Sequence, residues 1–166
     1  AADLFQAMGA SVAQLPGGEI VPAMERGVID GFEFNNPTSD RRFGAQDVAK
    51  NYMMGSHHQA TEYFEIMFNK GKFDALPAEH KAILQYAAEA VSSANEWKAM
   101  DYYSKDLQEL MSKDKVSVLR TPKDVFDAQI KAWDGLIAGL EKDPFMKKVM
   151  DSQKAWVRRV VYYNMY

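Results

Sequence analysis

Four side chains in two short segments could bind a ligand or a metal ion: Glu33, His57, His58 and Gln59. Glu33 stands between two phenylalanines, where burying an unpaired carboxylate would be costly. Simple alternation along an extended segment would instead turn Glu33 to solvent, and the pattern alone leaves both interpretations open. Adjacent histidines on extended backbone point to opposite faces, so His57 and His58 are not expected to chelate one transition metal.

Motifs of covalent catalysis and of phosphate binding are missing from the sequence. Ser11, Ser39 and Ser56 lack the flanking glycines of a nucleophile elbow. The turn at residues 16–18 (PGG) is not followed by the lysine and hydroxyl residue of a phosphate loop. The sequence contains no cysteine, which excludes disulfides, zinc–thiolate sites and thiol catalysis. We therefore expect a protein that is not an enzyme.

The composition is that of an ordinary globular chain with a slight acidic excess. Its 166 residues suffice for one domain with a real core, and the formal net charge is −3. Nucleic-acid binding needs a clustered positive field, so no nucleic-acid partner is expected. The sequence has no run of about 18 apolar residues, and it therefore predicts no membrane-spanning helix.

The elements that must carry these side chains alternate between short helices and strands in the first half of the chain. The predicted elements are a helix over 3–8 closed by Gly9, a strand over 11–15, a helix over 19–26 stopped by Gly27, a strand over 28–34, a short helix and loop over 38–50, and a strand over 63–69. This alternation favours an α/β domain. Asn35 and Asn36 precede Pro37; they either form a turn or donate amides to an acid at a helix N-terminus, and both alternatives stay open.

The second half of the chain is predicted to be helical. Apolar residues recur at helical spacing from Ile83 to Met111, which indicates one long helix or two joined near Ser92. The other predicted elements are a strand over 116–119, a helix over 125–140 with a capping signal at Thr121, Pro122 and Asp124, and a last helix over 144–161 that starts at Asp143 and Pro144. No flexible linker is visible, so the segments read as one interleaved unit.

The most informative stretch of the chain joins residues 15–20 (LPGGEI) to residues 23–31 (AMERGVIDG). It resembles the pattern P-x-x-E-x-x-x-A-L-x-x-G-x-I-D-G-x-E of the solute-binding proteins of TRAP (tripartite ATP-independent periplasmic) transporters. Residues 73–80 (FDALPAEH) look like the start of the long helix of that family. Residues 143–161 resemble the last helix of the subgroup that binds 2-oxo and 2-hydroxy monocarboxylates.

The resemblance implies an α/β lobe of the type II periplasmic-binding-protein kind, with long C-terminal helices. Such a lobe is part of a two-lobed clamp that closes on its ligand. Residues 1–166 would then be the C-terminal portion of a solute-binding protein: most of the second lobe, with hinge strands and part of the first-lobe sheet. An arginine that pairs with the ligand carboxylate in the family has no counterpart in this sequence, which we expect to be a fragment of a longer protein.

The resemblance also implies a site for a cation that bridges to the ligand. Its ligands would be the Glu33 carboxylate, the backbone carbonyl of Phe34 and the side chain of Gln59, and oxygen donors of this kind suit Ca²⁺ or Na⁺. Phe34, Asn35 and His58 would contact the organic acid. His57 and His58 stand where the subgroup has aromatic residues, which suggests a more polar ligand.

The function implied is capture of a small organic acid in the periplasm and its delivery to the membrane permease subunits of a TRAP transporter. The alternatives are a dicarboxylate or sugar-acid binder that needs no metal, and a helical module that dimerises through residues 143–166. The subgroup further implies a homodimer formed through the C-terminal helix, which carries an apolar stripe that includes Trp156.

Overall fold

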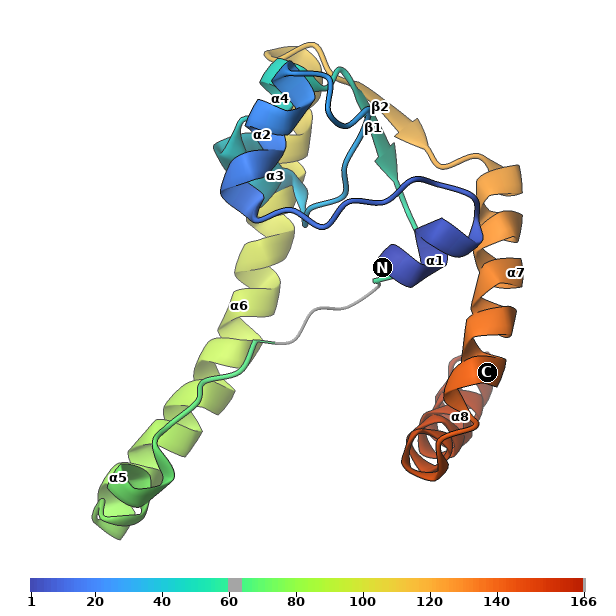
Figure 1. Ribbon diagram of the computed structural model, residues 1–166. Coiled ribbons are helices and arrows are strands. Elements are labelled where there is room, and N and C mark those ends of the chain that lie inside the picture. Colours follow the sequence, from blue (N-terminus) through green and yellow to red (C-terminus); the bar gives the residue numbers. More distant parts are fainter. Residues whose placement is uncertain (60–63, 166) are drawn as a thin grey trace. The chain divides into compact units, whose positions relative to one another are not determined.

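The computed structural model describes residues 1–59 and 64–165 of the chain (Figure 1). Its helices are α1 (Ala2–Ala7), α2 (Gly17–Glu25), α3 (Pro37–Phe43), α4 (Ala45–Val48), α5 (Lys70–Asp74), α6 (Ala78–Ser112), α7 (Lys123–Leu140) and α8 (Pro144–Asn164). Two strands, β1 (Asn51–Met54) and β2 (Ser117–Arg120), pair in parallel with Asn51 opposite Ser117. Within the described residues no helix is both long and apolar enough to cross a membrane.

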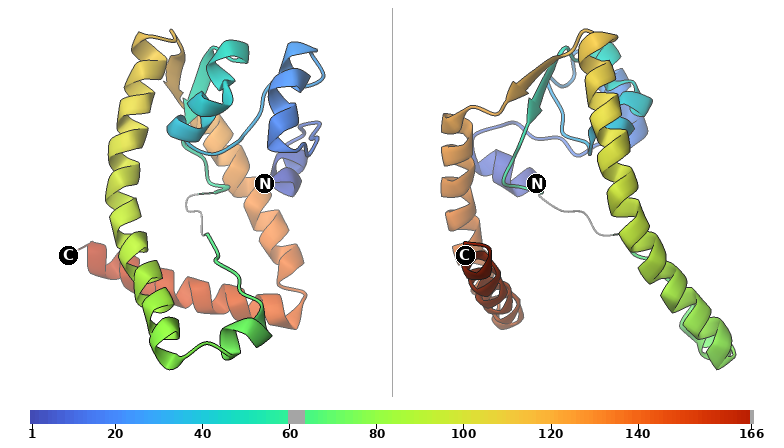
Figure 2. Two further views of the ribbon diagram at one scale, coloured as in Figure 1. Left: turned by 90° about the vertical axis from the view of Figure 1, so that its left-hand side faces the viewer. Right: turned by 180° about the vertical axis from the view of Figure 1, so that it is seen from behind.

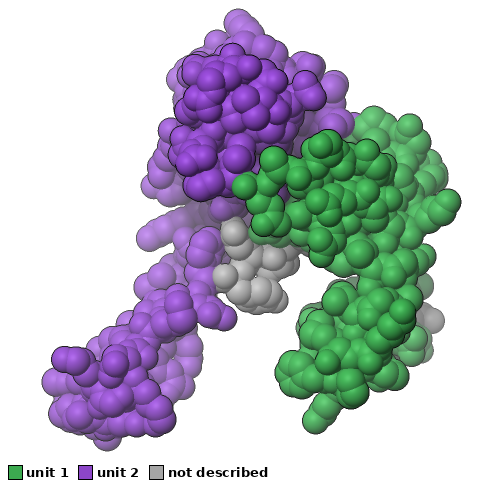
Figure 3. Space-filling model, viewed as in Figure 1, with its two compact units in different colours: residues 1–14, 55–60, 121–166 green, residues 15–54, 61–120 purple. Residues whose placement is uncertain are grey.

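The chain divides into two compact units (Figure 3). Unit 1 comprises residues 1–14, 55–60 and 121–166, and unit 2 comprises residues 15–54 and 61–120. The prediction of one interleaved unit is therefore wrong in number, although the segments do interleave. Both strands belong to unit 2, while the residues that directly follow them, Gly55 and Thr121, belong to unit 1. Such short crossings leave no linker that composition could reveal.

In unit 2, α3 packs against the C-terminal part of α6, where Leu110 is buried. Arg41 of α3 joins the two helices through ion pairs with Asp106 at 3.3 Å and with Asp114 at 2.8 Å. A third partner, Glu109, lies 2.5 Å from the same guanidinium. These contacts fix α3, and with it the turn that precedes α3, to the end of the long helix.

Helix α6 is one continuous helix of 35 residues, not two joined near Ser92. The Ser92 hydroxyl donates to the Ala88 carbonyl at 2.7 Å, so the helical ladder runs through this position. Figure 2 shows α6 as a single rod whose first turns extend away from α2, α3 and α4, with α5 beside its start. Lys81 donates to the Asp74 carbonyl at 2.8 Å and ties α5 to that end.

In unit 1, α1 packs on α7, and Leu4 of α1 is buried to 1% exposure. Gly9 directly follows Met8, the C-cap of α1, and has a φ of +95°, as predicted for a residue that closes a helix. Helix α8 starts as expected, because the Asp143 side chain accepts from the Met146 amide at 2.8 Å and Pro144 occupies the first turn.

Three predicted strands are wrong in the described residues. Residues 11–15 and 28–34 have irregular backbone, and so do residues 64–69 of the predicted strand over 63–69; Tyr63 itself lies outside the described residues. A strand requires a hydrogen-bonded neighbour, and the one sheet in the described part of the chain contains only β1 and β2. The predicted strand over 116–119 is confirmed as β2, whereas β1 (NYMM) has no alternation that would predict it.

Candidate functional site

The turn that carries Glu33, Phe34 and Asn35 leads into α3 in unit 2, and all three residues are exposed. Asn36 ends this turn and caps α3: its side chain accepts from the amides of Thr38 at 3.1 Å and Ser39 at 3.0 Å. Capping is thus the structural role of Asn36, one of the two roles left open by the sequence. Because the cap fixes the last residue of the turn, the backbone before it has a defined path.

The Phe34 side chain anchors the same turn by packing. Its ring stacks on that of Phe43 with centroids 4.6 Å apart and an interplanar angle of 12°. A Cβ placed on Gly17, at the start of α2, would lie 3.2 Å from the Phe34 ring, so the ring packs closely on the backbone of Gly17. The ring is therefore engaged within unit 2, and the backbone carbonyl is the part of Phe34 best suited to bind a cation.

Asp40 of α3 binds the turn at residues 33–35 through a buried carboxylate. Its side chain is 5% exposed; Oδ1 accepts from the Asn35 amide at 3.1 Å, and Oδ2 accepts from the Tyr52 hydroxyl at 2.8 Å. Burial raises the pKa of Asp40, against hydrogen bonds that lower it, and the negative charge of Glu33 raises it further. Burial and the bond to Asp40 likewise raise the pKa of Tyr52, so the phenol remains a donor.

The second candidate segment, Gly55 to Gln59, belongs to unit 1 and is held by Gln129 of α7. Gln129 is 3% exposed, and its Oε1 accepts from the His57 amide at 2.8 Å and from the Ser56 hydroxyl at 3.1 Å. A buried amide that satisfies two groups of an otherwise irregular segment restricts the conformation of that segment.

Two further side chains from the 121–133 region bind the same segment. The Trp133 indole Nε1 donates to the His57 carbonyl at 2.8 Å, and the Thr121 hydroxyl donates to the Gly55 carbonyl at 2.6 Å. The predicted capping role of Thr121 is therefore wrong: the N-cap of α7 is Pro122, and no side chain caps it. The Thr121 hydroxyl satisfies a backbone acceptor of the neighbouring segment instead.

The two histidines contact different neighbours, as predicted, although residues 57 and 58 form bends and are not part of a strand. The His57 ring is tilted against Phe126 with centroids 4.9 Å apart, and the His58 ring makes an edge contact with Phe5 at 5.3 Å. His58 Nδ1 is also hydrogen bonded to the Ser56 hydroxyl.

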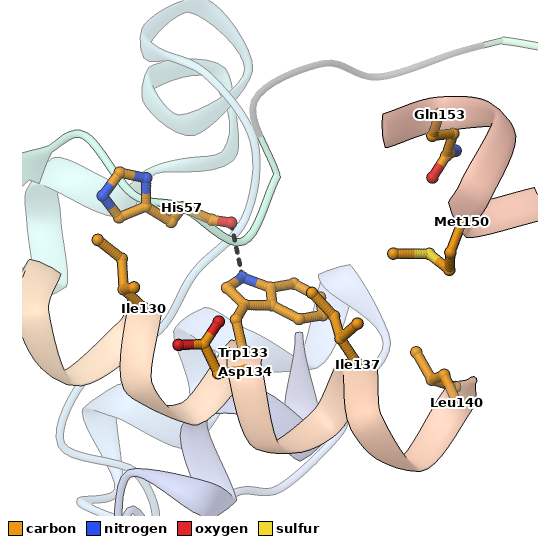
Figure 4. Close-up of a pocket in the computed structure, with 8 residues that line it drawn as sticks. All are labelled: His57, Ile130, Trp133, Asp134, Ile137, Leu140, Met150 and Gln153. Atoms are coloured by element: carbon orange, nitrogen blue, oxygen red, sulfur yellow. Dashed lines mark hydrogen bonds between the residues drawn. The ribbon is translucent and has the colours of Figure 1, made fainter. Parts of the chain in front are cut away.

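An open apolar pocket of about 550 Å³ lies between α7 and α8 in unit 1 (Figure 4). Its lining residues are His57, Ile130, Trp133, Asp134, Ile137, Leu140, Met150 and Gln153. The one acidic residue in this lining is Asp134, and an acidic side chain disfavours an organic anion. The pocket includes none of the predicted ligand-binding residues, and it does not suit a small acid.

The predicted site residues fall into two groups. Glu33, Phe34 and Asn35 lie on one turn of unit 2, whereas His58 and Gln59 lie on one segment of unit 1. Among the described residues, no three His, Cys, Asp or Glu side chains gather as a metal site. The predicted cation ligands are of another kind, since they comprise one carboxylate, one backbone carbonyl and one amide.

Sequence reasoning missed the residues that hold these two groups in place. Asp40 and Tyr52 act on the Glu33 turn, and Gln129 and Trp133 act on the His58 segment. The one sequence signal for Asp40 and Gln129 as structural residues is that each is a polar residue on the apolar face of a predicted helical segment. Asp40 lies only a few residues after Asn36, but it belongs to no motif that would have drawn attention to it, and Gln129 lies far in sequence from the segment that it holds.

Comparison with known proteins identifies the family. The profile of the bacterial extracellular solute-binding proteins, family 7 (DctP), matches residues 1–140. The chain belongs to this family. The resemblance seen in residues 15–31 is thereby confirmed, and the family is one of solute-binding components of transport systems.

Family 7 relatives with described ligands match nearly the whole chain. It is 26% identical over 159 residues to a monocarboxylate 2-oxoacid-binding periplasmic protein of Nostoc sp. PCC 7120, covering 95% of this chain and 43% of the relative. A TRAP periplasmic solute-binding protein of Colwellia psychrerythraea, solved with bound calcium and pyruvate, matches with a TM-score of 0.88 and 27% identity. The corresponding protein of Pseudoalteromonas atlantica T6c, with bound sodium and pyruvate, matches with a TM-score of 0.80 and 26% identity.

These matches show the fold class and the extent of the chain. Both structural matches cover 98% of this chain and 50% of the other, so the chain spans about half the length of the relatives that it matches. The expected periplasmic-binding-protein architecture is confirmed, with this chain as a helix-rich portion that carries a small parallel sheet.

Proposed function

We propose that the protein containing this chain is the periplasmic solute-binding component of a TRAP transporter and that it captures a small 2-oxo or 2-hydroxy monocarboxylate through a bridging cation. It would deliver that solute to the permease subunits in the membrane and would carry out no chemical reaction on it. The observation that carries the proposal is the match to the Colwellia protein with bound calcium and pyruvate, at a TM-score of 0.88 over 98% of this chain.

The donor atoms of the predicted site fit Ca²⁺ or Na⁺. Glu33 offers a carboxylate, Phe34 a backbone carbonyl and Gln59 a side-chain amide oxygen, and hard cations prefer oxygen ligands of this mixed kind. Glu33 is exposed, and the Phe34 ring is fixed by Phe43, so both can serve a ligand without loss of core packing. The cation, when bound, supplies a positive charge that pairs with the carboxylate of the acid. Phe34, Asn35 and His58 would contact the acid itself.

Calorimetric titration of pyruvate into the protein at its natural full length tests the proposal. With calcium or sodium present, we expect saturable binding, and removal of both cations should abolish it. Binding of a dicarboxylate or a sugar acid that persists without either cation would favour the metal-independent alternative. If no acid binds and the protein associates only through α8, the helical dimerisation module would replace the proposal.

We further propose that the protein is a homodimer whose subunits associate through α8. This helix exposes Phe145, Trp156 and Tyr163, and monomeric proteins rarely leave so much aromatic surface at one end. A family relative from Bordetella bronchiseptica RB50, with a TM-score of 0.68 and 27% identity, is a dimer with calcium and picolinate in one of its sites. It matches 91% of this chain and 47% of its own length.

A further inference from the structure

The direction of a backbone carbonyl follows from the hydrogen bond made by the amide of the same peptide group. In a trans peptide the C=O of one residue and the N–H of the next point in opposite directions. The described residues contain no cis peptide. The Asn35 amide donates to Asp40 Oδ1 at 3.1 Å, so the Phe34 carbonyl points away from Asp40.

The Asp40 side chain is held in the orientation that accepts from the Asn35 amide. Its second oxygen, Oδ2, accepts from the Tyr52 hydroxyl at 2.8 Å, and its side chain is 5% exposed. Tyr52 lies on β1, which pairs with β2, so the hydroxyl is presented from a regular part of unit 2. Asp40 itself lies in α3, whose start is fixed by the Asn36 cap and whose Arg41 is bound to α6. Tyr52 and Asp40 are therefore both held by regular secondary structure, Tyr52 in β1 and Asp40 in α3.

We propose that Asp40, held by Tyr52, is the positioning residue that orients the Phe34 carbonyl for the cation. This inference rests on the proposed function, because it takes Phe34 and Glu33 as cation ligands. Asp40 is not itself a ligand: one oxygen is bonded to Asn35 and the other to Tyr52, and the carboxylate is buried beneath the turn. Groups that orient metal ligands in this way typically change metal affinity by about 10- to 100-fold when removed.

Variants of Asp40 can separate the effect of its two hydrogen bonds from the effect of its negative charge. In Asp40→Asn, the amide oxygen can still accept from Asn35, and the new NH₂ can donate to the Tyr52 oxygen, which then acts as acceptor. That variant keeps both contacts and loses the charge. Asp40→Ala loses both contacts together with the charge, and Tyr52→Phe loses only the bond that holds Oδ2. Asp101→Asn, on an exposed part of α6, controls for the loss of one negative charge elsewhere in unit 2.

The experiment is calorimetric titration of the full-length protein with calcium alone, combined with hydrogen exchange of the Asn35 amide measured by NMR without calcium. We expect Asp40→Ala to weaken calcium binding by about 10-fold or more and Asp40→Asn by only about 3-fold. Tyr52→Phe should fall between them, and Asp101→Asn should match the unaltered protein. Exchange at Asn35 should become faster in Asp40→Ala and remain slow in Asp40→Asn, a readout that does not depend on any bound cation.

The outcomes separate this inference from the proposed function. If Asp40→Asn loses as much calcium affinity as Asp40→Ala, charge and not position is responsible, and the inference is overturned. It is equally overturned if folded Asp40→Ala binds calcium as the unaltered protein does. Should Asp40→Ala fail to fold, Tyr52→Phe provides the test. If both the calcium affinity and the Asn35 amide exchange of Tyr52→Phe match those of the unaltered protein, the positioning role of Asp40 is excluded. An unaltered protein that binds neither calcium nor pyruvate would overturn the proposed function, and the inference with it.

Discussion

The indole Nε1 of Trp133 donates a hydrogen bond of 2.8 Å to the backbone carbonyl of His57, which lies 76 residues earlier in the chain (Figure 4). The bond joins α7 to a segment that has no regular secondary structure of its own. Gln129, one helical turn before Trp133, accepts a hydrogen bond from the backbone amide of His57. His57 is thus bound by α7 through both its amide and its carbonyl, and the path of the neighbouring His58 and Gln59 follows from it.

Replacing Gln129 by leucine should lower the free energy of unfolding by about 2 kcal/mol, because the His57 amide and the Ser56 hydroxyl would lose a buried acceptor. Urea denaturation followed by circular dichroism measures this. Gln108→Leu, at an exposed position of α6, is the matched control and should change stability little. Equal stability of the two variants would show that the segment does not depend on Gln129.

Gly55 should not tolerate a side chain. Its φ is +103°, and an added Cβ would lie 3.1 Å from Phe126 Cζ, so Gly55→Ala combines backbone strain with overpacking and should cost about 2 kcal/mol. Gly135→Ala on α7, where a Cβ meets nothing within 4 Å, should instead stabilise the protein by about 0.5–1 kcal/mol. Thermal unfolding of both variants tests the prediction, and a stabilising effect of Gly55→Ala would contradict it.

Glu33→Gln should weaken cation binding and, in the same protein, the binding of pyruvate. The substitution keeps the size of the side chain and removes one negative charge, and ligand charge tunes the affinity of hard-cation sites. Calorimetry with and without a chelator measures both affinities, and Glu65→Gln serves as a control for charge on an exposed segment. If chelation and Glu33→Gln both leave pyruvate affinity unchanged, the cation bridge does not exist.

Acid should weaken unit 2 through the contacts of Arg41. The pKa of Asp106 is lowered most by its interaction with Thr38 and next by Arg41. The pKa of Glu109 is lowered most by its hydrogen bond with Lys113 and next by the charge of Arg41. A carboxyl group whose pKa is lower in the folded state binds protons more readily when unfolded. Its stabilisation is therefore present above the ordinary pKa and is lost as the pH falls through the folded value.

Arg41→Met should reduce this pH dependence, since Arg41 contributes to both shifts. The free energy of unfolding, measured at pH 6 and again near pH 3, should fall less in Arg41→Met than in the unaltered protein. Arg26→Met, at an exposed position after α2, should keep the full dependence. A slope that is the same in all three proteins would remove Arg41 from the explanation.

Truncation before α8 should dissociate the proposed dimer. The exposed aromatic residues of α8 are removed when the chain ends at Glu141, and the apolar surface that favours association goes with them. Multi-angle light scattering of the protein with and without residues 142–166 gives the oligomeric state directly. A monomeric parent, or a truncated form that remains dimeric, would refute the role proposed for this helix.

Local signals in the sequence were sufficient for most of the helices. Asp143 and Pro144 start α8, Gly9 closes α1, and the apolar spacing from Ile83 to Met111 predicts α6, because helix formation depends on residues a few positions apart. The family pattern in residues 15–31 was enough to place the chain among solute-binding proteins, and the profile match over residues 1–140 confirms this. The choice of Glu33, Phe34, Asn35, His58 and Gln59 as site residues remains a prediction.

Only the tertiary structure decided which extended segments pair and which buried side chains hold the candidate site. Residues 28–34 have a strand-like composition but no strand partner in the described chain, whereas the unremarkable β1 pairs with β2, because pairing depends on a neighbour distant in sequence. The bonds from Tyr52 to Asp40 and from Trp133 to His57 are hidden from the sequence for the same reason. A hydrogen bond requires donor and acceptor within about 3 Å, and folding brings these pairs together without any repeated spacing along the chain.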